Sequence, residues 1–238
     1  MQQNYFKADE ADCAVVGAGH AGIEAALACA RMGLSTLIFT LNLDAIGNMP
    51  CNPSIGGTGK GQLVYEIDAL GGEMGAAADK VTMQSRTLNL GKGPAVRSKR
   101  IQADRNLYRI IMKSTLERTP NLKIVQAEVI GADVSDGCVQ GIITSVGAYY
   151  KVRAAIICSG TYLRGRVIIG ENTLPSGPDG MLPANSLSDC LSKLGVKLMR
   201  FKTGTPPRIH RRSIDFSRLE RQDGEEHLIP YSFRTDET

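Results

Sequence analysis

The chain has 238 residues, of which 42% are hydrophobic and 22% charged, and its net charge is +4. This composition is that of a globular protein with a sizeable core, and the chain is long enough for one large domain or somewhat more. The sequence has no run of eighteen apolar residues that would predict a membrane span, and its first residues contain no apolar signal segment. We therefore expect a cytoplasmic protein without a membrane partner.

The six cysteines form no C-x-x-C pair and have no metal-ligand spacing, so the sequence predicts neither a disulfide framework nor a metal site. Cys13, Cys29 and Cys158 lie in apolar runs and are expected to be small core residues. Only Cys51 stands among turn-forming residues.

A glycine-rich turn follows a predicted strand at Cys13–Val16 and precedes a predicted helix. The spacing Gly17-x-Gly19-x-x-Gly22, with a further strand at 35–40, is typical of a dinucleotide-binding βαβ unit. Gly17 permits a tight turn, Gly19 lets a pyrophosphate approach the backbone, and Gly22 lets the helix pack on the strand. The first N–H groups of the helix then face the phosphates.

The second strand lacks the acidic residue that usually holds a ribose hydroxyl at its end. Thr40 or Asn42 takes its place, or Asp44 reaches back from a few residues further on. The motif alone leaves both NAD and FAD open.

The stretch from Asn48 to Leu63 carries Cys51 and Lys60 among prolines and glycines and has almost nothing to bury. Gly56 stands five positions after Cys51, where disulfide reductases have their second cysteine, so a dithiol pair is not expected. The stretch also lacks the first glycine and the final Ser or Thr of a P-loop. With both motifs excluded, the stretch offers a single thiol in a flexible backbone, with a cation near it in sequence.

Two further helices are predicted. The first covers 62–72, with Leu63, Ile67 and Leu70 as its apolar stripe. The second covers 100–119, with arginines on its outer face. Its expected inward residues are Ile101, Leu107, Ile110, Ile111 and Leu116.

Short strands at 122–129 and 138–146 flank an Asp-Gly turn signal and predict a small β meander. The apolar run 154–160 suits a central parallel strand whose carboxyl end meets a ligand, and a short helix is expected at 186–195. The fold class is therefore α/β, a Rossmann-like FAD-binding domain of the two-dinucleotide flavoprotein type. We expect it to cover 1–200, with a β-rich insertion around 122–152, and a truncated second domain to begin at 201–238.

Positive charge is concentrated in two segments. Residues 86–118 hold nine basic residues against Asp104 and Glu117, a net of +7, and residues 200–221 have a net of +5. Either segment alone is compatible with a solvated surface, but the two together favour a polyanionic partner.

Four blocks resemble one family in order from about Asp12 to Phe216: "GAGHAGIEAALACARMG", "NMPCNPSIGGTGKGQLVYEIDALGG", "LGKGPAVRSKRIQADR" and "FKTGTPPRI". The family is that of the tRNA uridine 5-carboxymethylaminomethyl modification enzymes, MnmG or GidA. The resemblance implies bound FAD, NADH as reductant, a homodimer, the GTPase MnmE as partner and tRNA as substrate. It also implies addition of a carboxymethylaminomethyl or aminomethyl group at C5 of the wobble uracil.

The resemblance further implies roles for single residues. Cys51 matches a family cysteine proposed as nucleophile at uracil C6, although a small loop residue is the alternative. Val129 matches a position at the adenine end of FAD, and Ala184 falls where relatives often have serine, so only a backbone contact is expected there. The residues expected to cradle the pyrophosphate are Gly17, Ala18, Gly19, His20, Ala21 and Gly22. Those expected to contact tRNA are Lys60, Arg97, Lys99, Arg100, Arg105, Lys202 and Arg208.

Family members are much longer, so the chain is expected to be a fragment that holds FAD weakly at best and completes no turnover alone. Three alternatives stay open. One is a folate- and FAD-dependent tRNA uridine methyltransferase of the TrmFO type, and another is a flavin oxidoreductase for a small molecule. The third is a non-catalytic RNA-binding module.

Overall fold

The computed structural model describes residues 5–236, and the chain divides into two compact units. The first contains the residues up to Asn48 together with Arg109–Arg200, and the second contains Met49–Tyr108 together with the residues from Phe201 on. The sequence predicted a single boundary at residue 200. The structure instead groups residues 49–108 with the segment that follows 200.

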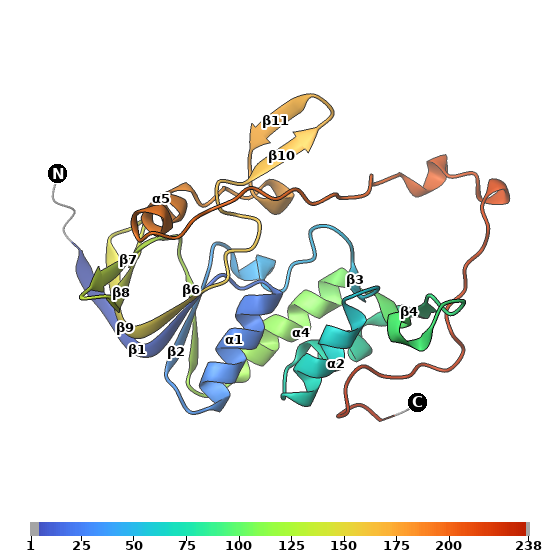
Figure 1. The fold of residues 1–238 in the computed structure, drawn as a ribbon, viewed down its shortest axis with the longest axis horizontal. Helices are drawn as coiled ribbons and strands as arrows, with labels where there is room; N and C mark the ends of the chain where they lie inside the picture. Colours follow the sequence, from blue (N-terminus) through green and yellow to red (C-terminus); the bar gives the residue numbers. More distant parts are fainter. Residues whose placement is uncertain (1–4, 237–238) are drawn as a thin grey trace. The chain divides into compact units, whose positions relative to one another are not determined.

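One six-stranded sheet forms the first unit, in the order β6-β2-β1-β9-β8-β7 (Figure 1). Four neighbouring strands are parallel: β6 (Leu122–Gln126), β2 (Thr36–Thr40), β1 (Phe6–Val16) and β9 (Ala148–Ile157). β8 (Cys138–Thr144) and β7 (Val129–Ser135) continue the sheet antiparallel. The parallel core confirms the predicted α/β class.

The β-rich insertion predicted around 122–152 covers strands that join the main sheet. β6 pairs in parallel with β2, from Thr36 opposite Leu122 to Thr40 opposite Gln126, so it belongs to the parallel core. The meander is also not a separate layer, because β8 pairs directly with β9. The sequence could not separate these cases, since a short apolar strand looks the same in either setting.

Helices cover both faces of this sheet. α5 (Asn185–Lys193) contacts β7, and its Leu187 shares a core cluster with Val16 of β1 and Phe39 of β2. α1 (His20–Arg31) contacts β1 and β2 and buries Ile23 and Leu27. Successive residues of a strand point to opposite faces of the sheet. The fully buried strand residues that alternate with those of the Leu187 cluster therefore point to the face covered by α1. A parallel sheet covered on both faces explains the nearly continuous apolar run of β2.

A β-hairpin completes the first unit. The strands β10 (Arg166–Ile169) and β11 (Asn172–Pro175) form an antiparallel hairpin that projects away from the sheet (Figure 1). Within residues 5–236, no helix is both long and apolar enough to cross a bilayer.

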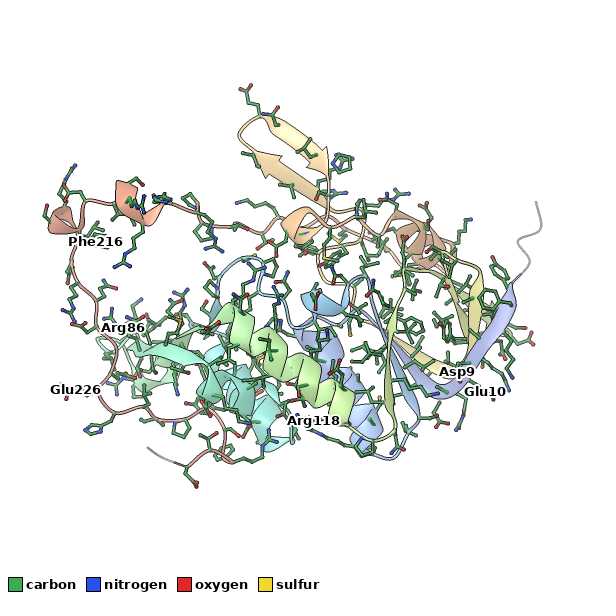
Figure 2. All side chains as sticks on the ribbon, turned by 180° about the vertical axis from the view of Figure 1, so that it is seen from behind. Asp9, Glu10, Arg86, Arg118, Phe216 and Glu226 are labelled. Atoms are coloured by element: carbon green, nitrogen blue, oxygen red, sulfur yellow. The ribbon has the colours of Figure 1, made fainter. Side chains whose placement is uncertain are left out.

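The second unit is built on a three-stranded antiparallel sheet in the order β3-β5-β4. Its strands are β3 (Ser54–Gly56), β4 (Thr82–Leu88) and β5 (Ser98–Ala103), and its helices are α2 (Gly61–Ala69) and α3 (Met74–Lys80). Residues 201–236 contain no strand and run beside β4, where Gln84 donates to the Gln222 carbonyl at 2.7 Å. Figure 2 labels Arg86 on this strand and Phe216 on the loop of the segment. Single 3₁₀ turns lie at 43–45, 94–96, 178–180, 211–213 and 216–218.

The predicted helix at 100–119 begins five residues later than expected, as α4 (Arg105–Arg118). Asp104 starts it, because its carboxylate accepts the backbone N–H groups of Asn106 and Leu107 at 2.9 and 3.0 Å. Ile101 is buried, but in strand β5. The predicted inward residues Leu107 and Ile110 are 41% and 63% exposed, and the buried stripe is Tyr108, Met112 and Leu116.

The apolar stripe predicted for the helix at 62–72, which precedes α4 in the chain, is also wrong. In α2, Leu63 and Leu70 are 52% and 91% exposed, and the buried side chains include Val64 and Asp68. Asp68 turns inward because its carboxylate accepts the Phe233 backbone N–H at 2.9 Å. A buried acid that binds a distant backbone segment rotates the helix away from the face that hydropathy alone favours.

Candidate functional site

The glycine turn stands between β1 and α1, as predicted. Gly17 has φ +109°, and a Cβ there would lie 2.3 Å from the Cys158 carbonyl oxygen. A Cβ on Gly22 would lie 1.7 Å from the Gly17 carbonyl oxygen, whereas a Cβ on Gly19 would meet nothing within 4 Å. Gly17 and Gly22 therefore serve packing, and the space beside Gly19 is open to a ligand.

This turn lies at the point where the strand order reverses. β1 has β2 on one side and β9 on the other, and all three end at the same edge of the sheet. The Gly17 N–H donates to the Phe39 carbonyl at 2.9 Å, and the Cys158 N–H donates to the Val16 carbonyl at 2.8 Å. In open α/β sheets this crevice binds ligands. The first turn of α1 has no acidic residue and no side-chain cap, so its positive end is compatible with a diphosphate.

The three candidates for the ribose contact differ in how they are engaged. The Thr40 hydroxyl donates to the Asn42 carbonyl at 3.0 Å, and the Asn42 side chain accepts the Asp44 N–H at 2.7 Å. The Asp44 side chain is 80% exposed and pairs with Lys113 at 3.2 Å. Asp44 thus keeps a carboxylate open to solvent beside the end of β2, while the other two side chains are used locally.

The remaining predicted cofactor residues are mostly enclosed. Burial lowers the pKa of His20, the first residue of α1, below its usual range. The Val129 side chain is 4% exposed and lies in the core cluster, so only its backbone can face a ligand. The Ala184 N–H already donates to the Tyr162 carbonyl at 2.8 Å, and its carbonyl accepts from the Arg164 N–H at 3.2 Å.

Cys51 lies in the second unit, half-buried, where a distant segment reaches it. Its sulfur is 3.8 Å from the Thr203 hydroxyl and accepts the Thr205 hydroxyl at 3.8 Å. Arg208 donates to the Cys51 carbonyl oxygen at 2.6 Å. The cysteine loop and the KTGTPPR segment, two blocks quoted from the sequence, thus meet at one thiol.

A model of the family described as Glucose inhibited division protein A matches residues 12–238. The chain belongs to this family. The match confirms the resemblance found in the sequence.

Relatives named tRNA uridine 5-carboxymethylaminomethyl modification enzyme MnmG are highly similar to the chain. The one from Caldicellulosiruptor saccharolyticus is 59% identical over 228 residues, which are 96% of this chain and 36% of that protein. The one from Clostridium novyi is 55% identical over 98% of this chain and 37% of its own length. The chain therefore spans little more than a third of the length of these relatives.

The crystal structure of Aquifex aeolicus GidA in form II matches with a TM-score of 0.91 and 49% identity. The match covers 95% of this chain and 38% of that one. The GidA-related protein from Thermus thermophilus matches with a TM-score of 0.55 at 21% identity over 77% of this chain and 68% of that one, which shows a shared fold alone.

Several basic residues singled out in this GidA-family chain lie at the surface of the second unit. Arg97 and Lys202 are exposed, and the Lys60 ammonium, at the start of α2, has no hydrogen bond or ion pair within the described chain. Arg100 is partly buried and donates to the Ser54 hydroxyl at 3.2 Å. Arg105 opens α4 and is partly buried.

Lys99 does not fit its predicted role as a phosphate contact. Only 9% of the residue is exposed, and its ammonium donates to the Ile229 carbonyl and lies 4.5 Å above the centre of the Tyr231 ring. Burial lowers the pKa of Lys99 from its usual value. Because the ammonium is engaged inside the unit, we leave Lys99 out of the tRNA contacts proposed below.

Sequence reasoning missed the side chains that touch the thiol. Thr203 and Thr205 lie 152 and 154 residues after Cys51, and no spacing rule predicts such a contact. Their only signal was that KTGTPPR stood out as a motif. Across the described residues, His, Cys, Asp and Glu side chains nowhere gather in a group of three that could hold a metal ion.

Proposed function

We propose that this chain is part of an FAD-dependent enzyme that modifies the wobble uridine of tRNA at C5 of uracil. The added group is carboxymethylaminomethyl or aminomethyl. The observation that carries the proposal is the meeting of the cysteine loop with the KTGTPPR segment at the Cys51 thiol. The printed names of relatives up to 59% identical support it.

In this proposal the glycine turn binds the FAD diphosphate. The open space beside Gly19 and the uncapped first turn of α1 fit a diphosphate. We assign the pyrophosphate cradle to residues 17–22, the ribose to Asp44, and the adenine end to the backbone near Val129 and Ala184. When bound, FAD would supply the chemistry that carries the one-carbon unit, and NADH is the proposed reductant of the flavin.

Cys51 is the proposed nucleophile. After its proton passes to water, the thiolate adds to C6 of uracil and the C5–C6 π electrons move to C5 and the adjoining carbonyl. C5 then attacks a one-carbon electrophile of the iminium class, derived from methylenetetrahydrofolate and glycine or ammonium. Loss of the C5 proton and breakage of the S–C6 bond restore the uracil double bond and return the electron pair to sulfur.

Basic residues of the second unit, some exposed and some partly buried, bind the tRNA backbone in this proposal. Phosphate contacts of Lys60, Arg97, Arg100, Arg105 and Lys202 give affinity without sequence specificity. Arg208 holds the Cys51 loop, because its guanidinium donates to the Cys51 carbonyl oxygen. The uridine has to leave the anticodon stack before a thiol can reach its C6 atom. The GTPase MnmE, a homodimer and a cytoplasmic setting are parts of the proposal taken from the family.

The test uses the whole protein with tRNA that lacks the modification. Nucleoside mass spectrometry distinguishes a carboxymethylaminomethyl or aminomethyl product from 5-methyluridine, the product of the alternative methyltransferase. Cys51→Ser is expected to abolish the product while the flavin absorbance and tRNA binding stay. Unchanged product formation by this variant would exclude the nucleophile, and a protein that never binds tRNA would favour a small-molecule oxidoreductase.

A further inference from the structure

Two threonine hydroxyls converge on the Cys51 sulfur from the same distant segment. Thr205 donates its hydroxyl to the sulfur at 3.8 Å, and the Thr203 hydroxyl lies at the same distance and can act as donor or acceptor. Sulfur is large, so 3.8 Å is within its hydrogen-bonding range. A thiol can donate its proton to Thr203 while it accepts from Thr205, and a thiolate can accept from both.

The local sequence allows both hydroxyls to reach the same atom. Residues 199–210 contain no helix or strand, so no backbone ladder fixes where the side chains of Thr203 and Thr205 point. Gly204 stands between the two threonines and brings no side chain. Pro206 and Pro207 then stiffen the backbone, because each fixes its own φ angle.

Arg208 fastens this segment to the cysteine loop. Its guanidinium donates to the Cys51 carbonyl at 2.6 Å, so the segment holds both the backbone and the side chain of the same residue. Arg208 therefore places no positive charge directly against the sulfur, because its guanidinium binds the carbonyl oxygen instead. Neutral hydroxyl donors stabilise a thiolate less than a cation does, so they leave it more able to attack.

We propose that Thr203 and Thr205 are positioning residues for the Cys51 thiol. They hold the sulfur in place and stabilise its negative charge when the S–C6 bond has not yet formed and again when it has broken. The inference rests on the proposed role of Cys51, but its chemical test does not require tRNA.

The experiment compares Thr203→Val, Thr205→Val and the double variant with the matching serine variants. Valine keeps the shape of threonine without the hydroxyl, and serine keeps the hydroxyl. The rate of Cys51 alkylation by iodoacetamide at neutral pH is measured by mass spectrometry in the whole protein. Cys138, an exposed cysteine in the other unit, is the internal reference in each digest.

Loss of one hydrogen bond to sulfur lowers the thiolate fraction about fivefold, but the remaining thiolate is about twofold more nucleophilic, so Cys51 alkylation is expected to slow by about two- to threefold, and by more when both bonds are lost. The serine variants are expected to stay within about twofold of the parent, and Cys138 to react at an unchanged rate. In the modification assay the valine variants lower kcat and leave KM for tRNA unchanged.

Valine variants that react as fast as the parent, or serine variants as slow as valine, would overturn the inference. Both threonines lie in an exposed segment, and a changed Cys138 rate would reveal a wider loss of structure. If the Cys138 rate changes, the role of the threonines is judged from the single serine variants, because these alter the fewest contacts. If the parent protein modifies no tRNA, the proposed function fails, yet the alkylation rates still decide the role of the threonines.

Discussion

Gly19 and Gly22 lie three residues apart in one turn and meet different surroundings. A Cβ at Gly19 would stand in open space, and Gly19 has φ −76°, which any residue adopts. A Cβ at Gly22 would collide with the Gly17 carbonyl oxygen at 1.7 Å. The spacing rule names both glycines, but only the structure separates a glycine needed for the ligand from one needed for packing.

Gly22→Ala is therefore expected to destabilise the protein, because backbone atoms have to move to admit the methyl group. Overpacking of this kind costs about 1–3 kcal/mol. Gly19→Ala, the matched control, meets no clash and is expected to cost less stability in the flavin-free protein than Gly22→Ala, while flavin retention falls, since the methyl group fills the proposed diphosphate space. Urea unfolding and the flavin absorbance of the purified variants measure the two effects. Equal loss of stability in both variants would contradict this division.

The free energy of unfolding of the protein is expected to depend on pH through Lys99. Burial lowers its folded-state pKa, so in alkaline solution below pH about 10.5 the unfolded chain binds more protons than the folded one. The free energy of unfolding should therefore rise with pH in this window. Lys99→Met is expected to flatten that rise, and denaturant unfolding at several pH values from about 8 to about 10 measures it. Lys60→Met, at an exposed lysine, is the control that should keep the parent's slope.

At the scale of single elements, α4 depends on a cap that hydropathy does not reveal. Asp104 accepts two backbone N–H groups and fixes the start of the helix at Arg105. Asp104→Ala is expected to cost about 1 kcal/mol of unfolding free energy, whereas Asp104→Asn keeps an acceptor and most of the stability. Chemical denaturation of both variants tests this. An alanine variant as stable as the parent would mean that tertiary packing alone sets the helix start.

The elements that sequence predicted best are those with a strong local pattern. β1, α1 and β2 follow from glycine spacing and apolar periodicity, and the helix at α5 follows from its amphipathic stripe. Residues 100–103 of β5 were read as helix, because the alternation of β5 is weak and its partner β3 is distant in sequence. The stripe of α2 was misplaced because Asp68 binds a segment far along the chain. Features that depend on local chemistry can be predicted from the sequence, whereas pairing between distant segments cannot.

At the scale of the whole molecule, the basic segments should determine how tRNA binding depends on salt. Arg211 and Arg212 are exposed in the segment with net charge +5, and each phosphate contact that is lost lowers the slope of log K against log salt by about 0.7–0.9. The double change to glutamine is expected to lower the slope by about 1–2 and to weaken binding to all tRNAs alike. The double change Lys151→Gln/Arg153→Gln is the matched control, because both residues are also exposed but pair with Glu10 and Asp12 and lie outside both basic segments. Filter binding between about 50 and about 300 mM salt measures the slopes. An equal drop in both variants would mean that net charge, rather than this surface, attracts the nucleic acid, and no drop in either would remove residues 211 and 212 from the tRNA interface.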